Sequence, residues 1–157
     1  MGWMIFERSK PRVVIVTPAQ QVTKDANAIF SVSKLTFPKI VKLAPITLKD
    51  VPADIQLFSL NGVTGQVYNK IQYENQKIGY QSSYIIPNFT TAEFMSALPK
   101  QLTSLTIKSP WLMQNGTRTD AVGYLEFTNN KSTAQARVTF FQQGSNVKVV
   151  AQTLSGK

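Results

Sequence analysis

The stretch of sequence that decides the fold is residues 121–151, AVGYLEFTNNKSTAQARVTFFQQGSNVKVVA. Apolar and polar side chains alternate along most of this stretch, and the polar clusters 129–132 and 143–146 interrupt the alternation. Strict alternation is typical of β-strands that bury one face, and such clusters are typical of the turns between them. The stretch therefore predicts antiparallel strands over about 117–128, 133–142 and 147–154.

One face of these strands is lined by small side chains. Pairing the strands across their turns gathers Ala, Gly and larger apolar residues on that face and leaves polar residues on the other. A sheet lined by Ala and Gly leaves room for a helix to pack closely. The predicted helix-facing residues are Ala121, Gly123, Leu125, Phe127, Ala134, Ala136, Val138, Phe140, Val149 and Ala151, and the predicted opposite face holds Tyr124, Glu126, Gln135, Arg137, Thr139, Lys148 and Gln152.

A single helix is predicted just upstream, over residues 90–98. Thr90 and Glu93 have the spacing of a capping box, in which each side chain bonds the backbone N–H of the other residue. Pro99 is expected to end the helix, because proline lacks a backbone donor and disfavours a helical residue before it. We expect this short helix to pack on the small-residue face.

Two Asn-Gly dipeptides, at 61–62 and 115–116, are typical of two-residue hairpin loops. Both residue types tolerate the positive φ angles that such a loop requires. The first dipeptide predicts a hairpin whose strands are 55–60 and residue 63 onward. The second predicts a turn between a strand at about 103–113 and the strand that follows it.

A further hairpin is predicted around residues 74–77, where polar residues separate two alternating segments. With a four-residue loop, Tyr73 lies opposite Ile78, and the pairing continues outward in both strands. A slip of one residue would invert both faces of this hairpin. In this register Tyr68 points outward.

The predicted fold class is α+β: a mainly antiparallel sheet made of hairpins, then one short helix, then a four-stranded meander packed on that helix. The alternative is an all-β sandwich with a helical insert. A helix followed by a curved meander resembles the layout of cystatin-like and NTF2-like folds, including the secretion-system domains built that way. The likeness is one of architecture, and no family motif accompanies it. Residues 1–157 are expected to form a single domain.

The composition excludes several kinds of chemistry. The chain has 157 residues with no Cys and no His. It therefore has no disulfide, no thiol nucleophile and no thiolate ligand, and it lacks the commonest metal ligand and the commonest general base. We predict that the protein is not an enzyme and has no catalytic residue, no metal site and no cofactor.

Two segments are unusual for a globular core. Residues 1–11 form an apolar and basic arm, and residues 37–52 form an extended strap punctuated by Pro38, Pro45 and Pro52. Proline removes backbone donors, so the strap is neither a long helix nor a central strand. Arms of this kind bind neighbouring subunits by strand addition or groove packing. The predicted interface residues are Trp3, Ile5, Phe6, Ile40, Val41, Leu43, Ile46 and Leu48.

The formal net charge is +9, from 17 Lys and Arg against 8 Asp and Glu. Such a charge favours acidic partners. Pairing of the strands places Tyr124 opposite Arg137 and Phe141 opposite Lys148, which predicts a small aromatic and basic patch. The residues predicted to contact an anionic partner are Lys34, Lys39, Lys42, Lys49, Arg137 and Lys148.

These features lead to the hypothesis of a non-enzymatic structural or adaptor subunit of a larger protein assembly, such as a virion component or a part of secretion or conjugation machinery. The expected partners are other protein subunits, including further copies of the same chain. The alternative is a basic module that binds nucleic acid, or another polyanion, through its phosphates. No transmembrane segment and no signal peptide is predicted. A virion or extracytoplasmic location is favoured, with the cytoplasm as the alternative.

Overall fold

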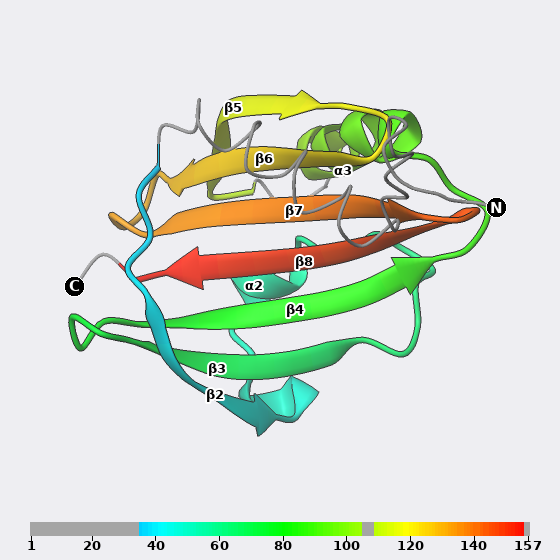
Figure 1. Cartoon of the computed structure of the whole chain (residues 1–157). Helices are drawn as coiled ribbons and strands as arrows, with labels where there is room; N and C mark the ends of the chain where they lie inside the picture. Colours follow the sequence, from blue (N-terminus) through cyan, green and yellow to red (C-terminus); the bar gives the residue numbers. More distant parts are fainter. Residues whose placement is uncertain (1–34, 105–108, 156–157) are drawn as a thin grey trace, which may run out of the picture.

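Figure 1 shows the computed structural model, which describes residues 35–104 and 109–155. Over these residues the chain forms a seven-stranded antiparallel sheet in the order β2-β3-β4-β8-β7-β6-β5. The prediction of a mainly antiparallel β-protein is confirmed. The strands are β2 (Ile40–Ile46), β3 (Val67–Tyr73), β4 (Ile78–Ile86), β5 (Trp111–Arg118), β6 (Val122–Asn129), β7 (Gln135–Gln143) and β8 (Asn146–Leu154), and the helices are the 3-10 helix η1 (Leu48–Asp50), α2 (Ala53–Gln56) and α3 (Thr91–Ser104).

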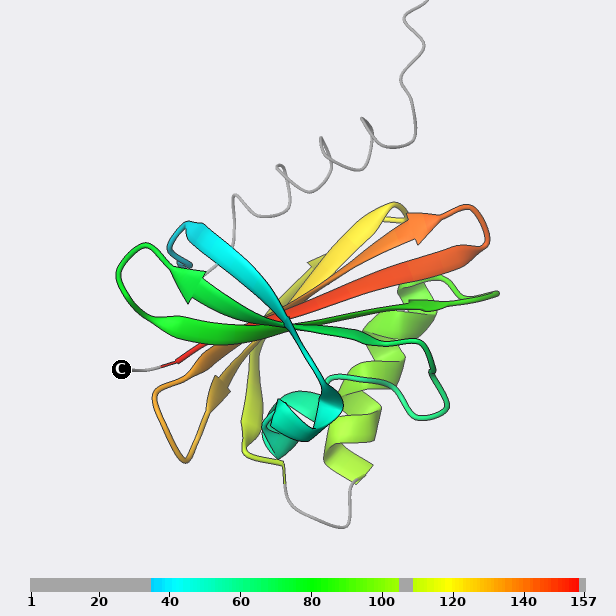
Figure 2. The same ribbon diagram turned by 90° about the horizontal axis from the view of Figure 1, so that it is seen from below.

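Both α-helices lie on the same side of the twisted sheet (Figure 2). We call this side the helix face and the other side the reverse face. The main core lies between the helix face and the helices, where the rings of Phe94 and Phe140 are 4.7 Å apart. Phe58, which follows α2, packs in the same core against Trp111 and Phe127. Because α3 packs mainly against β5, β6 and β7, it covers only that part of the helix face.

The predicted faces of the last three strands and the predicted register of β7 with β8 are confirmed, whereas β6 pairs with β7 two residues away from the predicted register. Leu125 of β6 pairs with Val138 of β7, and Val138 pairs with Ala151 of β8. Ala136 and Phe140 lie on the same face and are fully buried beneath α3 and its neighbours. Small residues such as Ala136 therefore lie on the helix face of the sheet, on which α3 packs against β5, β6 and β7.

The predicted capping box is also present, but the predicted end of the helix is wrong. The Thr90 N–H donates to Glu93 Oε1 at 3.0 Å, and the Glu93 N–H donates to Thr90 Oγ1 at 3.1 Å. The helix continues through Pro99 to Ser104. Phe94, Leu98 and Leu102, each four residues from the next, are all buried in the core, and this packing outweighs the backbone hydrogen bond that proline removes. No helix in the described ranges is long and apolar enough to cross a membrane.

The prediction for the first strand of the meander is wrong. The strand β5 begins at Trp111 instead of about 103 and runs through Asn115 and Gly116 without turning. Gly116 lies where a Cβ atom would be 2.7 Å from Leu125 Cδ2, so it permits close packing and does not form a loop. The turn lies at 119–121, where the Thr119 hydroxyl accepts two backbone N–H bonds.

The predicted hairpin at Asn61-Gly62 is also wrong. Residues 53–56 form α2 instead of a strand. Ile55 and Phe58, three residues apart, are buried on one side, which is helical rather than strand spacing. Gly62 does adopt a positive φ of 85°, but no paired strands flank it in the described structure.

The second hairpin forms with a register one residue away from the predicted one. Its loop has three residues, Glu74 to Gln76, and Gln76 adopts a φ of 66°. Ile78 therefore pairs with Gln72 and not with Tyr73. Because one residue of slip exchanges the faces, Tyr73 lies on the reverse face, whereas Tyr68 is buried in the main core instead of pointing outward.

Residues 35–39 cross the reverse face of the sheet before they enter β2 at its edge (Figure 1). Leu35 contacts Arg137 of β7, near the middle of the sheet, and Phe37 packs on Tyr73 of β3. The strap at 37–52 is thus an extended crossing, the edge strand β2 and the 3-10 helix η1. Pro45 fits an edge strand, because its missing N–H can face away from the sheet.

Candidate protein interface at the β2 edge

Three of the predicted interface residues are exposed along the β2 edge. The exposed fraction of the residue is 62% for Val41, 44% for Leu43 and 55% for Leu48. We call these three residues the β2 edge surface. They are three of the large apolar residues that are exposed in the described structure, and they fall within eight consecutive residues.

The other two interface residues on the strap pack within the protein. Ile40 joins a small cluster on the reverse face with Ile71, Tyr73 and Leu154. Ile46 packs on the main core from the helix face. They hold β2 against the sheet, so they are not part of the β2 edge surface. Trp3, Ile5, Phe6 and Lys34 lie outside the described residues.

The edge strand carries features that oppose the addition of another strand. β2 contains Pro45, the exposed Lys42 and an irregular register between Ile40 and Lys42. Proline, lysine and bulges are common devices that protect sheet edges from backbone pairing. A partner at this edge would therefore contact side chains rather than extend the sheet.

The reverse face contains a buried ion pair. The Glu126 carboxylate is fully buried, and its Oε2 accepts bonds from Nε and Nη2 of Arg137 at 3.1 and 3.0 Å. Glu126 Oε1 accepts a bond from Asn115 Nδ2 at 3.3 Å. Arg137 also donates to the Leu35 carbonyl at 2.6 Å, and its guanidinium lies 4.8 Å from the Phe37 ring. These contacts of Arg137 therefore join the sheet to residues 35–39.

The predicted pairing of Tyr124 with Arg137 is wrong. Tyr124 pairs with Thr139, while Arg137 pairs with Glu126. Tyr124 is also buried instead of outward, and its hydroxyl accepts a bond from Asn115 Nδ2 at 3.1 Å. Burial raises the pKa of Tyr124, and the charge of Glu126 raises it further.

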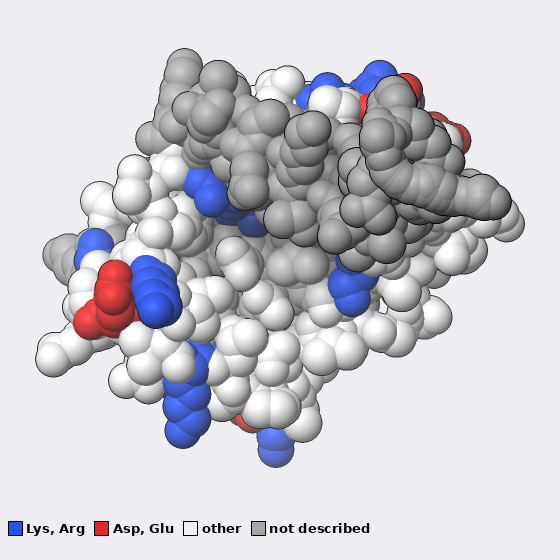
Figure 3. All heavy atoms as spheres, in the orientation of Figure 1, with Lys and Arg blue, Asp and Glu red and all other residues white. Residues whose placement is uncertain are grey.

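The predicted pairing of Phe141 with Lys148 is present on the reverse face, where Phe141 packs against Val122 and Tyr124. Over the side of the molecule seen in Figure 3, the cations lie in separate positions, most of them among uncharged side chains and some of them beside an acidic one. Lys39 lies beside Glu74 and Lys49 lies in η1 next to Asp50. The described cations predicted to bind an anionic partner thus do not form one continuous surface.

The hydroxyls of the buried Tyr73 and Tyr84 donate hydrogen bonds to backbone carbonyls and so stabilise the fold. The Tyr73 hydroxyl donates to the Thr153 carbonyl at 2.8 Å, and burial raises the pKa of Tyr73 to about 12, an effect that the charge of Arg137 opposes. The Tyr84 hydroxyl donates to the Phe58 carbonyl at 2.8 Å, and burial raises its pKa as well. Within the described ranges, no three acidic residues come together in a way that would hold a metal ion.

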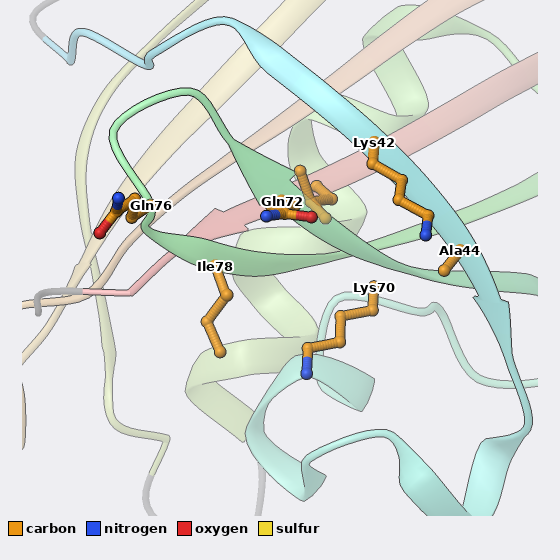
Figure 4. Close-up of a pocket in the computed structure, with 7 residues that line it drawn as sticks. Lys42, Ala44, Lys70, Gln72, Gln76 and Ile78 are labelled. Atoms are coloured by element: carbon orange, nitrogen blue, oxygen red, sulfur yellow. The ribbon is translucent and has the colours of Figure 1, made fainter.

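A shallow pocket of about 600 Å³ lies on the helix face beside β2, beyond the part that α3 covers. Figure 4 shows Lys42 on β2 and Lys70 with Gln72 on β3. Lys42 is among the residues predicted from the sequence to contact an anionic partner, whereas the two β3 residues are not. The signal that would have found them is the register of β2 against β3, which places Lys42 opposite Gln72 and Ala44 opposite Lys70.

No protein-family model, no curated protein and no solved structure matches the chain.

Proposed function

We propose that the protein is a non-enzymatic structural or adaptor subunit of a larger protein assembly, such as a virion or a secretion or conjugation machine. The observation that supports this proposal is the β2 edge surface. Single exposed apolar residues are ordinary. Val41, Leu43 and Leu48 instead lie close together in the sequence on an edge element that Ile40 and Ile46 anchor to the sheet.

The partner contacts the β2 edge through side chains. Lys42 and Pro45 protect the edge and disfavour backbone pairing with a partner. Burial of the exposed aliphatic side chains by a partner is favourable, because it removes apolar surface from water. The α+β class belongs to the same proposal: α3 packs on one face of one antiparallel sheet, which supports an adaptor with a rigid body and a separate binding edge.

A non-enzymatic role is supported by the way the titratable residues of the sheet are used. Glu126 and Arg137 bind each other, and the hydroxyls of Tyr73 and Tyr84 donate to backbone carbonyls. These contacts join strands and segments of the fold. Such residues stabilise the sheet, and a general acid or base would instead face a substrate cavity.

Site-specific photocrosslinking in cells that produce the protein tests the proposal. A photoreactive benzoylphenylalanine replaces Val41 or Leu43 in turn, and the matched control places it at Ser96, which is exposed on α3. We expect a discrete protein adduct from the two β2 positions and none from position 96. Adducts of equal yield from all three positions, or none from β2, would contradict the proposal.

The alternative function, a basic nucleic-acid-binding module, is supported by the net charge of +9 and by the lysines of the β2–β3 pocket. Binding through phosphates weakens steeply with salt, because each contact releases condensed counterions. A labelled DNA or RNA duplex titrated at low and at physiological salt tests it. Absence of binding at low salt would remove this alternative.

A further inference from the structure

We propose that the pocket between Lys42 and Lys70 binds an acidic segment of a partner protein, in which two carboxylates lie two residues apart in an extended chain. This inference rests on the proposed function, and it names the chemistry of the partner that sits at the β2 edge. The pocket adjoins that edge, because β2 contributes Lys42 and Ala44 to its lining.

The strand register places the two lysines as diagonal neighbours on the helix face. Lys42 lies opposite Gln72, and Lys70 lies opposite Ala44, two residues further along each strand. Diagonal neighbours of this kind are about 7–8 Å apart. Alternate residues of an extended chain point to the same side and are about 6.6 Å apart. Two carboxylates at positions i and i+2 therefore match the spacing of the two lysines.

The rest of the lining suits the same ligand. Gln72 and Gln76 carry amide groups that can donate hydrogen bonds to carboxylate oxygens, and no acidic residue lines the pocket. Two like charges on one face repel each other, and an anion between them removes that repulsion. Ile78, which is 38% exposed, offers an apolar contact for the methylene groups of glutamate.

Charge argues against a second copy of the chain as the occupant. Each copy carries a net charge of +9, so two copies repel one another at long range. The lining also differs from a single-strand nucleic-acid site, which combines a track of cations with aromatic side chains that stack on bases. Two lysines and no aromatic residue line this pocket.

The test uses fluorescein-labelled peptides and the full-length protein at low salt. The probe is a ten-residue peptide of alternating Ser and Glu, its control alternates Ser and Gln, and a labelled DNA duplex forms a third arm. We expect fluorescence anisotropy to report binding of the Glu peptide and no binding of the Gln peptide. Lys42→Gln with Lys70→Gln is expected to weaken Glu-peptide binding about threefold to tenfold.

The matched control is Lys100→Gln with Lys131→Gln, which removes the same charge from exposed positions outside the pocket. We expect this pair to leave the affinity within about twofold. An equal loss in both double variants would overturn the site, since only net charge would then matter. Tighter binding of the DNA duplex that depends on Lys42 and Lys70 would overturn the carboxylate assignment and favour nucleic acid.

This test and the crosslinking test can fail separately. Loss of crosslinks from the β2 positions with intact, lysine-dependent peptide binding would overturn the proposed function and leave the pocket chemistry standing. Crosslinks from the β2 positions without peptide binding would overturn the pocket alone. All four substituted lysines are exposed, and a thermal melt of each double variant confirms that it folds.

Discussion

Replacing Gly79 by alanine is expected to destabilise the protein far more than the same change at Gly116. An added Cβ at Gly79 would lie 1.8 Å from the backbone oxygen of Thr153, whereas at Gly116 its nearest neighbour would be Leu125 Cδ2 at 2.7 Å. A carbon atom and a carbonyl oxygen need about 3.3 Å. The end of β8 would therefore have to move by about 1.5 Å, whereas the tip of the Leu125 side chain can rotate away.

The cost at Gly79 follows from the hydrogen bonds that this movement breaks. The Thr153 carbonyl accepts a bond from the buried Tyr73 hydroxyl at 2.8 Å, and the Thr153 hydroxyl accepts one from the Tyr80 N–H at 2.9 Å. Each buried polar group left without its bond costs about 1–3 kcal/mol. Losing both costs about 2–6 kcal/mol, from which alanine recovers about 0.4–1 kcal/mol by restricting the unfolded chain. At Gly116 we expect about 1 kcal/mol.

Urea unfolding followed by far-ultraviolet circular dichroism measures both free energies. We expect Gly79→Ala to lose about 2–5 kcal/mol relative to the unaltered protein. Tyr73→Phe is then expected to cost less in the Gly79→Ala background than alone, because its hydrogen bond is already broken. Equal losses for the two glycine variants, or independent effects of Gly79→Ala and Tyr73→Phe, would refute the reasoning.

Four further outcomes are expected. Phe94→Ala should lower the free energy of unfolding by about 3–5 kcal/mol in urea, because the ring is fully buried; a loss under about 1 kcal/mol would contradict the packing. Arg137→Met should cost about 3 kcal/mol, and clearly less when Glu126 is already Gln, whereas additive costs would argue against the ion pair. The pKa of Tyr73 is raised from 10.0 to about 12, so its contribution to stability is complete below pH 10 and is lost as the pH rises through 12. Unfolding measured from pH 9 to 12 should therefore show a steeper decline for the unaltered protein than for Tyr73→Phe, and parallel curves would count against this. Deleting residues 1–11 should leave a folded monomer that no longer associates, and an unchanged native mass of the assembly would contradict that role of the arm.

The parts of the fold that the sequence predicts correctly are those with a redundant local pattern. In β6, β7 and β8 the alternation determines which face each residue occupies, because a slip of one residue would place Val138 and Phe140 in water. The capping box at Thr90 is equally local, because the two side chains bond each other's backbone. Such signals need no knowledge of distant residues.

The predictions are wrong where tertiary contacts or an unusual backbone conformation determine the local structure. Gln76 adopts a positive φ that is uncommon for a residue with a side chain, so the three-residue loop has no sequence signature and the register moves by one. Pro99 remains inside α3 because Leu98 and Leu102 bury the same stripe on both sides of it. The Asn-Gly pair at 115–116 is used for close packing against α3 and β6.

The candidate site is predictable only in part for a similar reason. Proline spacing and apolar content identify the segment that becomes β2, and Val41 and Leu43 are exposed on it. Neither Lys70 nor Gln72 is identified, because a polar residue on a strand ordinarily indicates a solvated face. Their grouping with Lys42 depends on the pairing of β2 with β3 and on α3 covering only part of the helix face.

The crossing at residues 35–39 determines how the protein would respond to pulling. Ahead of β2 the chain is fastened to Arg137, which holds both the Leu35 carbonyl and the Phe37 ring and is itself bonded to Glu126 inside the sheet. Tension applied from the amino-terminal side therefore loads the contacts of Arg137 with Leu35 and Phe37 first. The hydrogen bonds between β2 and β3 are loaded only after these contacts break. In a subunit tethered by its amino-terminal segment, that arrangement would shield the edge strand from mechanical load.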